Sequence, residues 1–401
     1  MSKFFSKRLL ALGLFLFIFP VIAHAGIGDL PEIGSLAAVV MDASTGTIVY
    51  SKNPDMEIPP ASLTKLMTMH LAFREVYAGR AFMNEIIEPT SESWARNQLP
   101  LSSLMHLAPG QRLSLRELFL GLAIFSGNDA SAAMALRFAP TIDHFVEMMN
   151  LEARAMGLTR TRFVDASGYS EYNMTTAREF AEFSRIYLYA NPQSLMEFHA
   201  VREFAYPRPE NVAGPYQEDP RTRVQRNRNT LLGRIEGVDG LKTGSIPAAG
   251  FNIALTAKRN DTRFIAVTLG APNERGGDRI RDDDGVRLLE WAFDNFKTLQ
   301  PQLENPEPFR VWKGKRNYVS TVWGTPLYFT VLKERGEDLD WFIELENPII
   351  APLPVFSHVG SLVFFDRLGE LHRVPVLSAQ EVERGGFFRR LFDSIRLFFS
   401  R

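Results

Sequence analysis

The sequence predicts an α+β protein with two folded units, and three observations support this prediction. Runs of β-branched and apolar residues stand near both ends of the first 299 residues, with helical periodicity between them. A second series of short β-like runs follows residue 300. The chain has 401 residues, which exceeds one typical domain, and its 45% hydrophobic and 23% charged residues are typical of a globular protein.

The first 25 residues have the pattern of a signal peptide. Basic residues precede an apolar run from Leu9 to Ile22, and Ala23-His24-Ala25 stands before Gly26. The alternative is an uncleaved membrane anchor, but this run is shorter than the ~20 residues that a spanning helix needs. We therefore expect cleavage after Ala25 and export of the mature chain.

The first folded unit is predicted over residues 26–299. Residues 36–41 and 47–50 form β-like runs around a turn, which predicts an antiparallel hairpin. Helical periodicity begins at Ser62 and dominates to about residue 196. Residues 251–257 and 263–269 are β-like runs separated by Asn260 and Asp261, which predicts a second hairpin, and a helix from Asp284 to Phe296 is expected to close the unit. We expect its first and last strands to share one antiparallel sheet.

The second unit is predicted over residues 300–383. Residues 300–308 are rich in proline and polar side chains and are interpreted as a linker. Beyond them, short β-branched and aromatic runs are broken by glycine and proline, which predicts a small all-β domain.

Several classes of site and partner are disfavoured by what the sequence lacks. It contains no cysteine, which excludes disulfides, thiolate metal sites and a cysteine nucleophile. Its seven histidines show no metal-ligand spacing, so we expect neither a metal nor a cofactor. The formal net charge of -1 gives no electrostatic basis for binding nucleic acid. No particular oligomeric state is predicted.

A serine and a lysine three residues apart, Ser62 and Lys65, begin the first helical segment. On a helix this spacing places both side chains on one face, so the hydroxyl can meet the amine. Lysine can act as the base that a serine nucleophile needs if burial or neighbouring cations lower its pKa. The alternative for an isolated match is a capping serine followed by a surface lysine.

Two further short motifs carry polar side chains suited to a cleft. Ser126-Gly127-Asn128 follows an apolar run and precedes an alanine-rich helix; a hydroxyl there can relay a proton, and a carboxamide can both donate and accept. By itself this pattern is also typical of a helix N-terminus. Lys242-Thr243-Gly244 falls on an expected edge strand, where the glycine would let a bound peptide lie against the backbone. The alternative is a polar edge strand with a solvated lysine.

Together the three motifs resemble those of the penicillin-interacting serine acyltransferases. The stretches Pro60–Lys65, Ser126–Ala130 and Asp239–Gly244 are similar to the serine-type D-alanyl-D-alanine carboxypeptidases, a family of low-molecular-mass penicillin-binding proteins. The resemblance covers residues 35–290 and extends more loosely to the tail. It implies a β-lactamase/transpeptidase-like catalytic domain with an antiparallel sheet flanked by helices, then a small all-β domain and a C-terminal amphipathic helix.

The resemblance also implies an activity: removal of the terminal D-alanine from peptidoglycan pentapeptide stems through an acyl-enzyme, with β-lactams as covalent inhibitors. Ser62 would be the nucleophile, Lys65 its base and Ser126 a proton relay. The implied substrate-binding residues are Asn128 for the substrate amide, Lys242, Thr243, Gly244 and Arg228 around the terminal carboxylate, and Ser245, whose backbone amide joins that of Ser62 in an oxyanion hole.

One position departs from the family pattern, because close relatives often carry histidine where this chain has Ser245. The backbone donor survives the change, but a hydroxyl does not reproduce the size or charge of an imidazole, so the resemblance does not imply the family's fine substrate preference or deacylation rate for this chain. Serine β-lactamases share all three motifs and D,D-endopeptidases share the fold, so both remain alternatives. A catalytically silent cell-wall scaffold is a further alternative, which the presence of both Ser62 and Lys65 disfavours.

The tail, residues 384–401, is predicted to be an amphipathic helix that anchors the chain to a membrane. Its apolar residues 388, 391, 392, 395, 398 and 399 share one helical face, and arginines lie on the other. We expect residues 386–401 to lie in the lipid interface at the periplasmic face of the cytoplasmic membrane. The alternative is a terminal helix that docks on the protein's own β domain.

Overall fold

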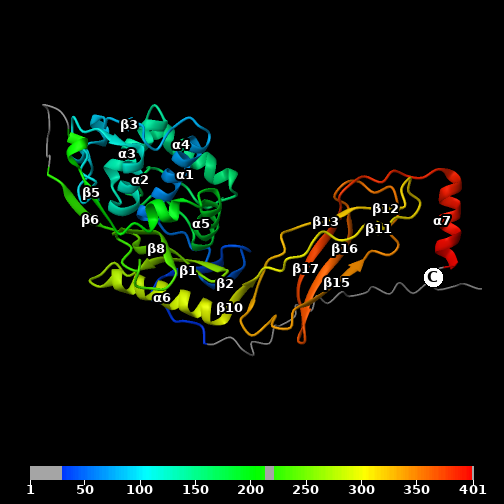
Figure 1. The fold of residues 1–401 in the computed structure, drawn as a ribbon. Coiled ribbons are helices and arrows are strands. Elements are labelled where there is room, and N and C mark those ends of the chain that lie inside the picture. The colour runs from blue at the N-terminus through cyan, green and yellow to red at the C-terminus, as the bar shows by residue number, and fades with distance from the viewer. Residues whose placement is uncertain (1–28, 213–220, 400–401) are drawn as a thin grey trace, which may run out of the picture.

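The computed structural model describes residues 29–212 and 221–399, so the predicted signal peptide lies outside the described residues. Figure 1 shows two units side by side: a larger one built from a sheet and helices, and a smaller one built from strands. The C-terminal helix lies at the end of the smaller unit that is farthest from the larger one. This arrangement is the α+β architecture followed by an all-β unit that the sequence predicts.

The larger unit is built on a five-stranded antiparallel sheet with strand order β2-β1-β9-β8-β7. Its strands are β1 (Ala37–Asp42), β2 (Ile48–Lys52), β7 (Val238–Ile246), β8 (Gly250–Arg259) and β9 (Thr262–Ala271). β1 pairs with β9 along its whole length, which confirms that the first and last strands share one sheet. β7 lies at the edge, as expected for the strand that carries Lys242.

The sheet separates two hydrophobic cores, and β1 shows why its sequence is continuously apolar. Ala37, Val39 and Met41 face one core, while Ala38 and Val40 face the other, so every residue of the strand is buried. Successive side chains of a strand point to opposite faces, and both faces of this sheet are covered by helices (Figure 1). One core lies under the helical half of the unit, and the other lies under α6.

The helical half lies between β2 and β7 in sequence. Its main helices are α1 (Lys65–Tyr77), α2 (Leu115–Leu120), α3 (Asn128–Phe138), α4 (Ile142–Ala155) and α5 (Ala177–Ala190). Single turns precede or extend some of them: 3₁₀ helices at Ala61–Thr64, Ser91–Ser93, Ala95–Asn97 and Pro209–Val212, and π-helical turns at Gly121–Phe125 and Leu195–His199. Two short hairpins, β3 (Ile86–Ile87) with β4 (Leu113–Ser114) and β5 (Glu203–Tyr206) with β6 (Arg223–Arg226), complete it.

Helix α6 (Gly277–Asn295) begins seven residues before the predicted start at Asp284, so that boundary was wrong. The first turns contain a run of charged residues that breaks the apolar periodicity, but two of these residues are buried. Asp284 accepts hydrogen bonds from the backbone and hydroxyl of Ser35 at 2.7 and 2.6 Å, and buried Arg281 pairs with Asp282. Polar contacts thus replace apolar packing along this part of the helix.

A buried carboxylate ties the two units together. Strand β10 (Phe296–Leu299) follows α6 directly and pairs with β14 (Phe329–Leu332) of the second unit. Asp42, at the end of β1, accepts hydrogen bonds from the hydroxyls of Thr298 at 2.6 Å and Thr330 at 2.8 Å. A hydrogen bond to a charged group stabilises by about 1.5 to 3 kcal/mol, so these two bonds fix the β unit to the end of β1.

The second unit has its own hydrophobic core around a four-stranded sheet of order β13-β17-β16-β15. The strands of this sheet are β13 (Thr321–Trp323), β15 (Asp340–Leu345), β16 (His358–Asp366) and β17 (Gly369–Ser378). A separate two-stranded sheet consists of β11 (Phe309–Arg310) and β12 (Tyr318–Val319). No helix or strand is assigned to residues 300–308, the predicted linker. The predicted division at residue 300 stays a prediction, but β10 already pairs with the second unit before it.

The tail forms helix α7 (Phe387–Phe399), which docks on the β unit through its polar side. Asp393 is buried and accepts a hydrogen bond from the backbone N–H of Lys313 at 2.6 Å, and Arg389 donates to Asn317. The apolar face points outward: Phe388, for example, is 73% exposed. The other exposed members of that face are Leu391, Phe392, Ile395, Phe398 and Phe399. The docked-helix alternative therefore holds for the polar side only.

No helix within residues 29–212 and 221–399 is long and apolar enough to span a bilayer. α7 itself has 13 residues, which at 1.5 Å each give about 20 Å, well short of the ~30 Å hydrocarbon core.

Candidate active site

The three sequence motifs meet at one cleft between the helical half and the sheet edge. The turn Ala61–Thr64 before α1 presents Ser62, and the first residue of α1 is Lys65. The junction between the π-helical turn and α3 presents Ser126, and β7 presents Lys242. Ser62, Ser126, Thr243, Ser245 and Arg228 line one cavity of about 270 Å³. The structure thus brings together residues separated by up to 183 positions.

Ser62 and Lys65 are in hydrogen-bonding contact, as the spacing predicted. The Lys65 Nζ lies 3.2 Å from the Ser62 Oγ, 2.8 Å from the Asn128 Oδ1 and 2.6 Å from the Ser167 carbonyl oxygen. Lys65 is fully buried, whereas Ser62 is partly exposed to the cleft. The amine is thus held against the hydroxyl from the protein side, and the hydroxyl faces incoming ligands.

Burial lowers the pKa of Lys65 from 10.5 to about 7. Removal of the ammonium from water is the main cause; the carboxylates of Asp165 and Asp129 oppose the shift, and the cation of Arg228 reinforces it. A large fraction of Lys65 is therefore neutral near pH 7. A neutral amine beside a serine hydroxyl can remove its proton, which is the requirement for a serine nucleophile.

A second serine–lysine pair lies opposite the first. The buried Lys242 Nζ donates to the Ser126 Oγ at 3.0 Å and to the Thr243 carbonyl at 3.0 Å. Burial, followed by the charges of Lys65, Arg228 and Arg281, holds the pKa of Lys242 well below its usual value. Ser126 has left-handed backbone angles, φ 59° and ψ 33°, which turn its side chain out of the π-helical turn. Its hydroxyl lies on the Lys242 side of the cleft.

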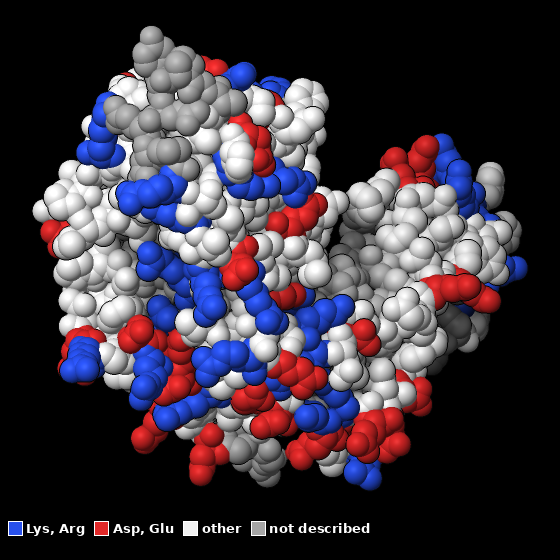
Figure 2. Space-filling view, turned by 60° about the vertical axis from the view of Figure 1, so that its left-hand side comes forward, with Lys and Arg blue, Asp and Glu red and all other residues white. Residues whose placement is uncertain are grey.

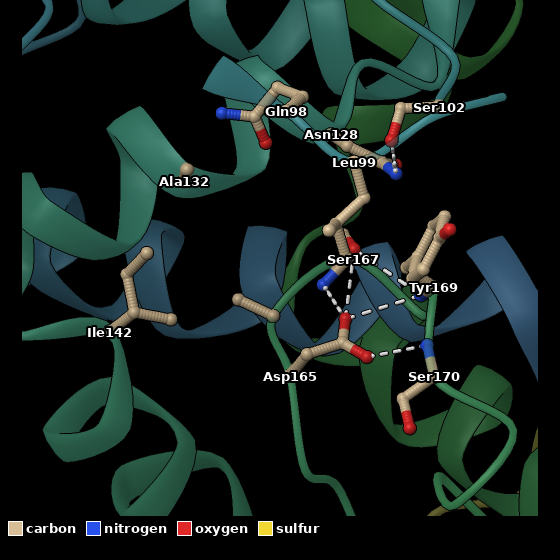
Figure 3. A pocket seen from close by; sticks show the side chains of 11 residues that line it. Gln98, Leu99, Ser102, Asn128, Ala132, Ile142, Asp165, Ser167, Tyr169 and Ser170 are labelled. Atoms are coloured by element: carbon tan, nitrogen blue, oxygen red, sulfur yellow. Dashed lines mark hydrogen bonds between the residues drawn. The ribbon is translucent and has the colours of Figure 1, made fainter. Parts of the chain in front are cut away.

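Asn128 connects the base to the rim of the cleft. Its carbonyl oxygen accepts from Lys65, and its amide nitrogen donates to the Ser102 hydroxyl at 3.0 Å (Figure 3). Both ends of the carboxamide are therefore occupied within the protein. Asn128 also lines the groove beside Ser62, where a substrate amide could reach it. Its role as a ligand of that amide stays a prediction.

Gly244 is required by close backbone packing, a different reason from the predicted one. A Cβ at this position would lie 2.9 Å from the Ser62 backbone nitrogen and 2.9 Å from the Pro60 carbonyl oxygen. The glycine therefore allows β7 to approach the nucleophile turn closely. Ser245 and Ser62 line the same cavity, and the predicted oxyanion hole of their two backbone amides stays a prediction.

One end of the cleft is strongly basic. Arg228 lines the 270 Å³ cavity together with Thr243 and the buried Arg281. The Arg228 Nε lies 3.4 Å from the Phe125 carbonyl, which is a weak bond, and Asp278 supplies one carboxylate to the lining of the same cavity. With Lys242 behind it, this end suits a carboxylate. The other end opens into a groove of about 550 Å³ lined by Leu99, Tyr169 and Tyr172, which suits a less polar group.

A loop that sequence reasoning missed holds the base in place. Asp165 accepts hydrogen bonds from the backbone N–H groups of Ser167 at 2.7 Å, Gly168 at 2.6 Å and Ser170 at 2.8 Å, and Figure 3 shows its carboxylate at the centre of this turn. The turn presents the Ser167 carbonyl to Lys65. An Asp followed two residues later by Ser and then Gly is a turn signal, but nothing in the sequence shows which side chain the turn meets.

Asp129 performs a similar structural task on the other side of Asn128. Its buried carboxylate accepts from the backbone of Met105 at 2.8 Å, His106 at 2.7 Å and Leu107 at 2.9 Å, even though burial raises its pKa. These bonds fix the loop that carries Ser102, the partner of Asn128. Within the described residues, no group of three or more His, Asp or Glu side chains is placed to hold a metal ion.

Comparison with known families gives two matches that divide the chain. Residues 25–273 match the model described as D-alanyl-D-alanine carboxypeptidase, and residues 296–384 match the C-terminal domain of penicillin-binding protein 5. D-alanyl-D-alanine carboxypeptidase DacC of Escherichia coli is 31% identical over 395 residues, covering 96% of this chain and 94% of that protein. A D-alanyl-D-alanine endopeptidase of Pseudomonas aeruginosa is 28% identical over 69% of this chain and 83% of its own length.

Solved structures show the same architecture. Penicillin-binding protein 5 of Haemophilus influenzae has a TM-score of 0.78 and 26% identity, covering 89% of this chain and all of that one. Penicillin-binding protein D2 of Listeria monocytogenes in its ampicillin-bound form has a TM-score of 0.56 and 26% identity, covering 66% of this chain and all of that one. The first similarity extends into both units, whereas the second is limited to about two thirds of the chain.

Proposed function

This chain belongs to the D-alanyl-D-alanine carboxypeptidase family, and from that premise we propose that Ser62 and Lys65 carry its chemistry. It is a serine-type D-alanyl-D-alanine carboxypeptidase and penicillin-binding protein that acts on peptidoglycan. The assignment of roles to individual residues rests mainly on one observation. A fully buried lysine amine with a pKa of about 7 lies 3.2 Å from a serine hydroxyl that faces the cleft.

Acylation begins with proton transfer from the Ser62 Oγ to the neutral amine of Lys65. The Oγ then attacks the carbonyl carbon between the last two D-alanines, forming a C–O bond. The backbone amides of Ser62 and Ser245 stabilise the negative charge that develops on the carbonyl oxygen. Collapse breaks the C–N bond, and Ser126 relays to the leaving amine the proton that Lys65 took from Ser62, so D-alanine departs, Lys65 is neutral again and the stem stays on Ser62. Lys65 then takes a proton from water, whose oxygen attacks the acyl carbon. The ester C–O bond breaks, the proton returns from Lys65 to the Ser62 Oγ, and the shortened stem leaves as a carboxylate.

Orientation of the stem follows from the two ends of the cleft. Its terminal carboxylate lies at the basic end near Thr243, Lys242 and Arg228, and its remaining residues extend along the groove past Asn128 and Tyr169. β-Lactams place a carboxylate and a strained amide in the same relation, so they acylate Ser62 as substitutes for the peptide. A serine β-lactamase or a D,D-endopeptidase shares this cleft, but both family matches together favour the carboxypeptidase.

Recognition of the terminal carboxylate gives a direct test of this orientation. Conversion of the C-terminal carboxylate of a D-alanyl-D-alanine peptide to an amide is expected to lower kcat/KM by about 10²-fold or more, because the charge-assisted bond to Arg228 and the hydrogen bonds to Lys242 and Thr243 are lost. The measurement is D-alanine or D-alaninamide release from the two peptides under the same conditions. Equal turnover of both would show that the basic end does not bind a carboxylate.

We further propose that the mature enzyme is exported and attaches peripherally to the periplasmic face of the cytoplasmic membrane through α7. The outward apolar face supports this proposal, because exposed phenylalanines on one face of a docked helix favour insertion into the lipid interface. Full burial of a large apolar side chain stabilises by about 1.5 to 3 kcal/mol, and insertion into the lipid interface would give about half of that for each of the six side chains. The sum is several kcal/mol of binding free energy. The tail's arginines add attraction to anionic lipid of about 1 kcal/mol each.

Truncation after Glu383 is expected to abolish vesicle binding and to leave turnover of small peptides unchanged. The motif residues of the cleft all lie before residue 246, and α7 docks only on the β unit. Binding is measured by co-sedimentation with vesicles of phosphatidylglycerol and phosphatidylcholine at low and high salt. A substitution control, Phe388→Ser/Phe392→Ser/Phe399→Ser, keeps the Asp393 contact and should show the same loss. Binding by either variant as tight as that of the full chain would place the anchor elsewhere.

A further inference from the structure

A hollow of about 450 Å³ lies outside the catalytic cleft, on the side of the first unit that carries β5 and β6. Three arginines line it, and we call it the arginine hollow: Arg202, Arg226 and Arg234. Glu203 supplies the one carboxylate among its described lining residues. Within residues 29–212 and 221–399, none of the three guanidinium groups has a side-chain hydrogen bond or ion pair.

The backbone around the arginine hollow is firmly fixed. The Asn227 amide nitrogen donates to the carbonyls of His199 at 3.1 Å and Val201 at 2.9 Å, which ties the residue after β6 to the segment that precedes β5. At Gly233, with φ +70°, a Cβ would lie 1.7 Å from the Arg202 Nη2. The guanidinium of Arg202 therefore lies directly against this glycine, whose positive φ is a backbone conformation that favours glycine.

Three cations around one hollow repel each other unless an anion joins them. Many other arginines of the first unit have carboxylate partners, such as Arg263 with Asp239 and Arg259 with Glu290. Figure 2 shows Lys and Arg side chains gathered across the middle of the first unit, whereas acidic and basic side chains lie interspersed in its lower part. Guanidinium groups bind carboxylates in a bidentate geometry, so the arginine hollow suits a ligand with one or more carboxylates.

The location of the arginine hollow indicates the source of that ligand. Thr230 lines both the hollow and the 270 Å³ cavity of the active site, so the hollow adjoins the basic, leaving-group end of the cleft. β5 and β6 lie at one extreme of the molecule and α7 at the other, so a bilayer held by α7 is remote from the hollow (Figure 1). The nearby ligand is then the polymer that the cleft acts on, whose stem peptides end in carboxylates.

We propose that the arginine hollow binds carboxylates of a second stem peptide, next to the stem whose D-alanine is removed. The proposal rests on the carboxypeptidase function proposed above. It makes Arg202, Arg226 and Arg234 specificity residues that direct the enzyme to polymeric peptidoglycan rather than to single soluble stems. Electrostatic attraction at exposed sites weakens with salt, so this preference is strongest at low ionic strength.

The test compares polymer with small peptide in the variant Arg202→Gln/Arg226→Gln/Arg234→Gln. We expect KM for purified peptidoglycan sacculi to rise about tenfold, which corresponds to about 1.4 kcal/mol for the loss of three exposed ion pairs. The salt dependence of sacculus binding should flatten as well. Turnover of a soluble pentapeptide and acylation by labelled penicillin should stay within about twofold, because the hollow contributes no residue to the reacting atoms.

A matched variant, Arg154→Gln/Arg367→Gln/Arg384→Gln, removes the same charge from other exposed positions and should leave KM for sacculi unchanged. An equal rise in KM for sacculi in both variants would overturn the proposal and indicate a general effect of charge. No rise in KM in the first variant would overturn it as well, because the arginine hollow would then have no role in binding the polymer. If the first variant loses affinity for anionic vesicles instead of sacculi, the hollow binds lipid phosphate and the proposal is wrong. Failure of wild-type pentapeptide turnover would refute the proposed function itself, which is a separate result.

Discussion

Ser62→Ala is expected to abolish penicillin acylation and to reduce peptide turnover by at least about 10⁴-fold, while the protein stays folded. The substitution removes the atom that forms the acyl bond, and loss of the catalytic serine in other serine enzymes reduces kcat by this order of magnitude or more. Because the backbone amide of residue 62 and the basic end of the cleft persist, a D-alanyl-D-alanine peptide should still bind. The measurements are labelled-penicillin incorporation, D-alanine release and calorimetric peptide binding.

Ser103→Ala provides the matched control, since Ser103 lines the same cavity as Ser62. We expect this variant to acylate at close to the wild-type rate, because the Ser103 hydroxyl has no lysine amine beside it among the contacts of the described residues. Retained acylation in the Ser62 variant, or loss of acylation only in the Ser103 variant, would contradict the assignment of the nucleophile.

Lys65→Met is expected to slow acylation of Ser62 by about 10²- to 10⁴-fold, the usual contribution of a positioned base. Methionine approximates the volume of lysine in this fully buried site but has no proton acceptor of comparable strength. The Asn128 and Ser167 oxygens lose a donor, so some loss of stability, about 1 to 3 kcal/mol, is expected as well. Thermal unfolding separates this effect from the kinetic one.

The pH profile distinguishes a base from a structural lysine. Lys65 has a pKa of about 7, lowered from 10.5, and it accepts a proton only in its neutral form. Acylation by the wild type should therefore fall about tenfold per pH unit below 7 and reach a plateau above it. Lys65→Met should show no such dependence near pH 7. A wild-type profile that is flat from pH 5 to 8 would remove Lys65 as the base.

The sequence predicted the side chains of the site better than the groups that hold these side chains in place. Ser62 and Lys65 are three positions apart on a helical segment, so local geometry alone places their side chains together. Ser126 and Lys242 are 116 positions apart, and only the resemblance to a family joined them before their 3.0 Å contact was seen. The Ser167 carbonyl that holds Lys65 is a backbone group, so it has no signature in the sequence.

The predicted start of helix α6 was wrong because polar contacts replace apolar packing in its first turns. Helix α6 begins at Gly277 instead of Asp284, because buried Arg281 and Asp284 form hydrogen bonds in place of the apolar periodicity. In the tail, periodicity gave the correct apolar face. It could not show that Asp393 docks the opposite face on Lys313, since that contact joins residues 80 positions apart.

The mechanism requires acylation of the Ser62 Oγ, and mass spectrometry of the intact and digested protein tests this most directly. After incubation with penicillin, we expect one equivalent of added mass, located on the peptide that contains Ser62, and a faster loss of adduct above pH 7 than at pH 5. With a D-alanyl-D-alanine peptide the same residue should carry the transient acyl group. An adduct located on Ser126, Ser103 or any residue other than Ser62 would contradict the mechanism.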